Sequence, residues 1–134
     1  MSTQQLRKRI QVQLKEQRSL TQSLLTLREQ IRGSLFVRYG KCGKGECACH
    51  LGRGHGPYYV FSSGSRGRGA FAYLGEHEVD VARQLLDRSR SFQRALRRLK
   101  KVNEELLVLL RRYQAAAGRL GARRLGIALA AKNA

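Results

Sequence analysis

The residues best suited to chemistry are three cysteines that lie close together in the chain. They form the pattern Cys42-x4-Cys47-x-Cys49, and His55 follows shortly after them. Thiolates and imidazole nitrogens are the ligands that zinc takes in tetrahedral sites, and ligands close in sequence allow one short loop to surround the ion. An odd number of clustered thiols argues against a disulfide framework. The pattern therefore predicts a structural zinc site.

The loop that contains these residues is rich in glycine, which supplies the positive φ angles that a tight turn needs. The basic residues Lys41, Lys44 and Arg53 would favour the thiolate forms and offset the negative charge of a three-thiolate site. His50 is an alternative fourth ligand. His55 lies across the loop from the cysteines, where it can close the site, so we expect it to complete the ligand set.

Catalytic chemistry finds little support in the sequence. A catalytic zinc keeps an open coordination position, usually with an acid or base beside it, and the only carboxylate in the loop is Glu46. Paired carboxylates, a Ser-His-Asp set and a phosphate-cradling motif are not visible. We therefore expect a protein that is not an enzyme, and we rank a metal-dependent enzyme last among the hypotheses.

This part of the chain resembles a family of small bacterial proteins without an established activity. The resemblance covers residues 31–74 and is carried by Ile31-Arg-Gly-Ser-Leu, Arg38-Tyr39, Cys42-Gly-Lys-x-x-Cys47-x-Cys49 and His55-Gly-Pro-Tyr-Tyr. Members are similar to products of mobile elements and phage-like regions. The resemblance implies that the three cysteines and His55 form one set with His50 outside it. It implies no enzyme, and it suggests a partner protein encoded by the same element.

Two long helices are predicted to flank the loop, because apolar and polar side chains recur there at alternating spacings of three and four. In the first helix, over residues 2–32, the seam is Leu6, Ile10, Gln13, Gln17, Leu20, Leu24, Leu27 and Ile31. In the second, over 76–117, it is Ala82, Leu85, Ser89, Phe92, Leu96, Leu99, Asn103, Leu106, Leu110, Tyr113 and Ala117. Gly33 and Gly118 are predicted to end the two helices.

Between the helices, three short segments rich in aromatic and β-branched residues are predicted strands. The predicted fold class is α+β, mostly α, with two long coiled-coil-like helices flanking a small three-stranded β unit with a Cys/His knuckle. The predicted parts are an N-terminal helix over 1–33, a β-hairpin and zinc-knuckle module over 34–75, a long basic helix over 76–117 and a basic tail over 118–134, either a short helix or disordered. The helices could pair with each other or with a second chain. The β unit is too small to cover both seams, so we expect a homo-oligomer, in the simplest case a homodimer.

The charge balance predicts an anionic partner. The chain has 27 Lys and Arg against 9 Asp and Glu, a formal net charge of +18. Such a surplus repels itself, and nucleic acid relieves the repulsion because each neutralised phosphate releases a counterion. No apolar run approaches the roughly 20 residues of a membrane span, and the first residues lack the order of a signal peptide. We therefore expect a cytoplasmic protein with no membrane partner, nucleoid-associated if it binds DNA.

Basic side chains are predicted to gather in the knuckle loop, at the tip of a hairpin and along one face of the second helix. The expected nucleic-acid contacts are Lys41, Lys44, Arg53, Arg66, Arg68, Arg83, Arg90, Arg94, Arg97, Arg98 and Lys101. They predict an accessory or regulatory protein that grips duplex DNA mainly through phosphates. One alternative is a protein that binds RNA or single strands. Another is a coiled-coil scaffold for an acidic protein partner.

Overall fold

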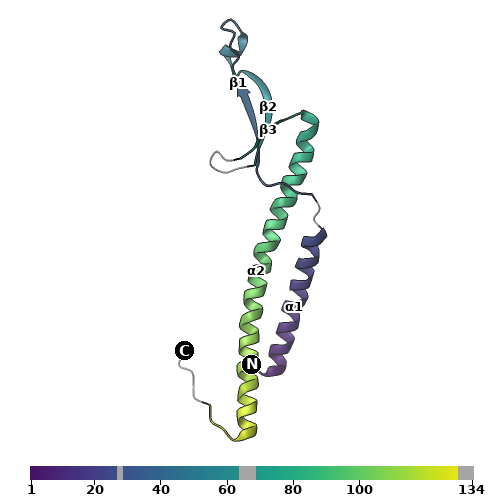
Figure 1. The fold of residues 1–134 in the computed structure, drawn as a ribbon, viewed down its shortest axis with the longest axis vertical. Coiled ribbons are helices and arrows are strands. Elements are labelled where there is room, and N and C mark those ends of the chain that lie inside the picture. The colour runs from purple at the N-terminus through teal and green to yellow at the C-terminus, as the bar shows by residue number, and fades with distance from the viewer. Residues whose placement is uncertain (27–28, 64–68, 130–134) are drawn as a thin grey trace. The chain divides into compact units, whose positions relative to one another are not determined.

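The computed structural model describes residues 1–26, 29–63 and 69–129 (Figure 1). In chain order the elements are α1 (Thr3–Thr26), β1 (Ser34–Gly40), the short 3-10 helix η1 (Ala48–Leu51), β2 (His55–Ser62), β3 (Phe71–Leu74) and α2 (Glu76–Leu125). The predicted fold class, with two helices flanking a three-stranded sheet, is confirmed. None of the described helices is both long and apolar enough to cross a membrane.

The chain divides into two compact units, which are described separately. The first unit joins residues 1–26 to residues 94–134, and the second comprises residues 27–93. In the first unit α1 lies antiparallel to α2. Arg7, near the start of α1, meets Tyr113 far along α2. Glu16 and Gln17, further along α1, meet residues that come earlier in α2, Arg98 and Asn103. Leu6, Leu109 and Ala116 form the core, with Ile10 and Tyr113 packed against it.

Two residues of the predicted α1 seam, Leu6 and Leu24, are buried, whereas Ile31 at its predicted end lies beyond α1. The α2 seam was partly wrong. Leu96 and Leu110 are exposed, whereas Val102 and Leu109 are buried in their place. The stretch 106–110 is apolar on several helix faces at once, so its pattern could not select the face that meets α1. The pairing of α1 with α2 covers the buried residues of both helices within one chain. The homo-oligomer stays a prediction.

Both helix ends differ from the predicted ones. The helix α1 ends at Thr26, and the backbone N–H of Ile31 donates to the Leu85 carbonyl oxygen at 3.2 Å in the second unit. The helix α2 continues through Gly118 to Leu125, because a glycine inside a helix costs only about 1 kcal/mol relative to alanine. The residue that follows the helix, Gly126, has a φ of 65°, the left-handed conformation typical of a helix terminus.

Asn103 has a partner within the same chain, since its Oδ1 accepts a hydrogen bond of 2.6 Å from Nε2 of Gln17. We expect Asn103→Leu to lower the free energy of unfolding by about 1 kcal/mol, because the part-buried Gln17 amide loses its partner. Adding Gln17→Leu should restore or raise stability, because two apolar side chains then meet. Urea denaturation of the two variants and the parent checks this. A stabilised single variant would contradict it.

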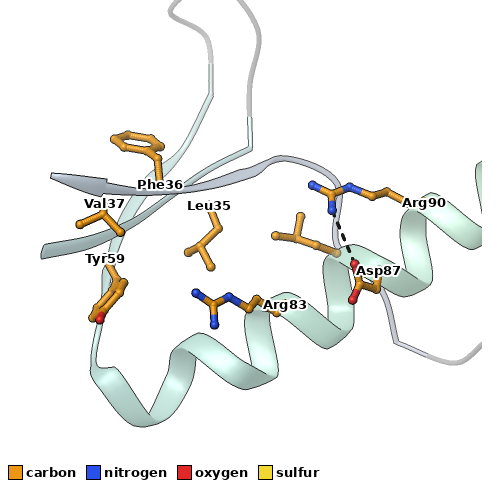
Figure 2. Close-up of a pocket in the computed structure, with 8 residues that line it drawn as sticks. Leu35, Phe36, Val37, Tyr59, Arg83, Asp87 and Arg90 are labelled. Atoms are coloured by element: carbon orange, nitrogen blue, oxygen red, sulfur yellow. Dashed lines mark ion pairs between the residues drawn. The ribbon is translucent and has the colours of Figure 1, made fainter. Parts of the chain in front are cut away.

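In the second unit, the sheet is antiparallel throughout, with strand order β1-β2-β3. Figure 2 shows Leu35, Val37 and Tyr59 on the side of the sheet that faces α2, and Phe36 on the opposite side. Phe61 shares the α2 side with Leu35, its partner in the register, and is buried. The sheet therefore turns one face towards α2, where Phe61 is buried and Val37 stays exposed. The opposite face is open to solvent at its aromatic side chains, whereas Val60 of the central strand is buried there.

Candidate metal centre

The knuckle is the connection between β1 and β2. Cys42 lies just after the end of β1, Cys47 immediately precedes η1, Cys49 lies within η1, and His55 is the first residue of β2. Because Gly40 pairs with His55 in the antiparallel register, the two strands bring the start and the end of the loop together. The loop then folds back between them and supplies the other two thiols.

The ligand atoms of Cys42, Cys47, Cys49 and His55 all lie within 4.8 Å of one another. The sulfurs of Cys42 and Cys49 are 3.5 Å apart, and the sulfur of Cys47 lies 3.4 Å from Nε2 of His55. A tetrahedral zinc with bonds of about 2.3 Å to sulfur and 2.0 Å to nitrogen holds its ligand atoms about 3.5 to 3.8 Å apart. These four side chains could therefore bind one metal ion.

Two glycines allow His55 to reach the cluster. Gly54 and Gly56 have φ angles of 94° and 142°, which side chains with a Cβ rarely adopt. A Cβ on Gly54 would lie 2.6 Å from the carbonyl oxygen of Gly40, and one on Gly56 would lie 2.9 Å from that of Arg38. The backbone on both sides of His55 thus runs too close to β1 for any larger residue.

Mutual hydrogen bonds shift the pKa values within the cluster. The pKa of the Cys42 thiol is lowered to about 6, chiefly by a hydrogen bond with His55. The hydrogen bond with Cys42 in turn raises the pKa of the His55 imidazole. A hydrogen bond with the backbone of Cys49 lowers the pKa of the Cys47 thiol. Metals bind the thiolate rather than the thiol, so Cys42 has the form that a metal needs at neutral pH.

Burial gives Cys49 a different character from the other two cysteines. The backbone N–H of Cys42 donates a hydrogen bond to the sulfur of Cys49, which favours the Cys49 thiolate and lowers its pKa. Desolvation and the neighbouring thiols outweigh this effect, so the pKa of Cys49 is raised. A cation within the cluster would remove this penalty by compensating the charge. The fourth position is filled by His55 and not by His50, whose Nε2 lies 2.8 Å from the carbonyl oxygen of Lys44.

The basic residues predicted around the knuckle are exposed. The Arg53 guanidinium lies 5.3 Å from the centre of the Tyr39 ring, a cation–π contact. Lys41 borders a hollow on the sheet. Arg66 and Arg68 lie outside the described residues.

The basic residues predicted on α2 differ in their partners. In the second unit, Arg83 pairs with Asp80 at 3.8 Å and Arg90 with Asp87 at 3.5 Å. In the first unit, Arg94, Arg97 and Lys101 are exposed. Arg98 makes two contacts of 2.7 Å to Oε1 of Glu16 on α1. Arg98 therefore links the helices and is poorly placed to act as a free phosphate ligand.

The strand aromatics alternate in the sequence, which predicts that about half of them pack in the core and leaves open which ones remain exposed. Arg38 and Tyr73 lie on β1 and β3, and Nη1 of Arg38 donates a hydrogen bond of 3.1 Å to the Tyr73 hydroxyl. Tyr58 on β2 meets the same Tyr73 ring edge to face, with ring centres 6.4 Å apart. The signal was the two-residue alternation within each strand, but that alternation does not tell which face is covered.

A family model described as a domain of unknown function (DUF6788) matches residues 3–84. The match includes α1, the whole sheet, the four clustered side chains and the start of α2. No curated protein and no solved structure matches the chain. The predicted resemblance to an uncharacterised family is thus confirmed in that form, whereas bacterial origin and a mobile element stay predictions.

Proposed function

Since the chain belongs to the DUF6788 family, whose function is unknown, we propose from its geometry and charge that it binds nucleic acid mainly through phosphates. The observation that carries this proposal is the excess of positive charge on α2. Residues 83–112 hold ten basic side chains against the acidic Asp87, Glu104 and Glu105. Phosphates of a polyanion would neutralise this excess of positive charge.

In this proposal the knuckle binds zinc, and the ion has a structural role. Three thiolates and one imidazole are a donor set that zinc prefers over magnesium or calcium, which take oxygen ligands. The ion would join the ends of β1 and β2 to η1, and it would stabilise the loop that carries Lys41 and Lys44. With four protein ligands the site is closed, so zinc would have no position for a substrate.

Duplex DNA is the first candidate ligand for α2. A long basic helix can follow phosphates without reading bases, and phosphate contacts carry no direct sequence information. We therefore propose an accessory or regulatory role with modest sequence preference. We extend the proposal to an accessory factor of a mobile element, as the resemblance of residues 31–74 implies.

Binding to a duplex of random sequence is expected to weaken steeply with salt. The slope of log affinity against log salt concentration should be about −0.9 for each phosphate contacted, because each contact releases counterions. Fluorescence anisotropy of a labelled duplex between about 50 and 200 mM salt measures this slope. If the protein binds neither duplex DNA, single-stranded DNA nor RNA at moderate salt, the proposal is wrong and the scaffold hypothesis with an acidic protein partner remains.

A further inference from the structure

The face of the sheet opposite α2 carries exposed aromatic side chains. The antiparallel register places Phe36, Val60 and Tyr73 side by side, and it places Arg38 beside Tyr58. Phe71 lies next to Ser62 on the same face. We call Phe36, Arg38, Tyr58, Phe71 and Tyr73 the outer face.

All four aromatic side chains of the outer face are exposed, and two of them are exposed by more than half; Phe36 is 42% exposed. The exposed fractions are 44% for Tyr58, 63% for Tyr73 and 65% for Phe71, whereas Phe61 on the opposite face is 7% exposed. Large apolar side chains grouped on a surface usually mark a binding site, since exposing them to water is unfavourable. The exposed rings of the outer face are therefore available to a ligand.

Cationic groups accompany these rings. A hollow of about 510 Å³ is lined by Arg38, Lys41, Tyr58 and Tyr73, together with Gly40 and Cys42. The hydrogen bond from Arg38 to the Tyr73 hydroxyl holds the guanidinium beside the rings. From residue 34 to residue 75 the sequence contains a single acidic residue, Glu46. The outer face thus joins stacking surfaces to positive charge.

We propose that the outer face binds the unpaired bases of a single-stranded nucleic acid. The rings of Tyr58 and Tyr73 would stack on bases, and Arg38 and Lys41 would contact the phosphates. Exposed aromatic rings on a sheet bind single strands in this way, because every base has a π-face that is available once it leaves the duplex. A second copy of this chain fits less well, because it carries the same excess of positive charge.

This inference rests on the proposed function only in that both ligands are nucleic acids. It concerns the outer face and single-stranded nucleic acid, whereas the proposed function concerns α2 and duplex DNA, so the two proposals can fail separately. The probe is a fluorescein-labelled oligo-dT of about 12 nucleotides, a length within the range that single-strand-binding modules cover. The variant Tyr58→Leu/Tyr73→Leu removes the rings and keeps apolar bulk. Its matched control, Tyr58→Phe/Tyr73→Phe, keeps the rings.

The leucine variant should bind oligo-dT at least about tenfold more weakly, given the usual contribution of base stacking. The phenylalanine variant should bind like the parent, and duplex affinity should change by less than about twofold in both. Zinc content and circular dichroism check that the variants fold. If the leucine variant does not fold, single Tyr73→Leu takes its place, because Tyr73 is mostly exposed.

A second readout uses the unmodified chain. It contains five tyrosines and no tryptophan, so no tryptophan emission masks the signal to which Tyr58 and Tyr73 contribute. Quenching by oligo-dT, lost in the leucine variant, supports the inference. Equal oligo-dT binding by parent and leucine variant overturns it, even if duplex binding is as proposed. A leucine variant that only shifts a dimer to a monomer in sedimentation also overturns it, because the outer face is then an interface between copies.

Discussion

Replacing His55 by alanine is expected to abolish stable zinc binding, whereas His50→Ala should leave it intact. His50 lies in η1 and His55 begins β2, but only His55 belongs to the group whose ligand atoms all lie within 4.8 Å of one another. Structural zinc sites bind with about 10–16 kcal/mol at neutral pH, and this binding energy is also folding energy. Loss of a ligand should therefore unfold the knuckle. Elemental analysis of the purified proteins gives the zinc content per chain.

The effect should be confined largely to the second unit. The α1–α2 pair of the first unit has its own core of Leu6, Leu109 and Ala116. Far-ultraviolet circular dichroism should accordingly keep most of its helical signal in His55→Ala, while the chemical shifts of the β2 amides lose their dispersion. Parent protein that retains its sheet after metal removal by a strong chelator would contradict the structural role of zinc.

Changing Arg94, Arg97 and Lys101 together to glutamate should weaken duplex binding severely and reduce its dependence on salt. If each side chain contacts one phosphate, the log–log slope becomes shallower by about 2.7, which is three times about 0.9. The reversed charges also repel the remaining phosphates. Fluorescence anisotropy on a labelled duplex measures both effects, and helix content should be unchanged because all three residues are exposed.

The matched control is Arg119, Arg123 and Arg124 changed to glutamate. These residues are also exposed on α2, and the substitutions alter the net charge by the same amount. The control should lose less affinity, because these residues lie beyond the predicted contacts. Equal losses in the two triple variants would show that overall charge, rather than the particular surface of Arg94, Arg97 and Lys101, determines binding.

The metal cluster was predictable from the sequence because its ligands are local. Cys42, Cys47 and Cys49 are separated by so few residues that any compact loop brings their sulfurs together. The sequence also favoured His55 over His50, and the antiparallel pairing of β1 with β2, which places His55 opposite Gly40, explains how its ring reaches the sulfurs. The helices and strands themselves followed from periodicity, since three-and-four spacing marks a helix face and alternation marks a strand.

Long-range packing was decided by tertiary structure alone. Two heptad seams are equally compatible with pairing inside a chain and between chains, and it is the contact of Gln17 with Asn103 that shows the pairing inside this one. Likewise, the strand pattern placed Tyr58 and Tyr59 on opposite faces but did not say which face α2 covers. Covering Tyr59 left Tyr58 to solvent. Exposure depends on what the rest of the chain packs against, so an aromatic surface on the sheet became visible only in the fold.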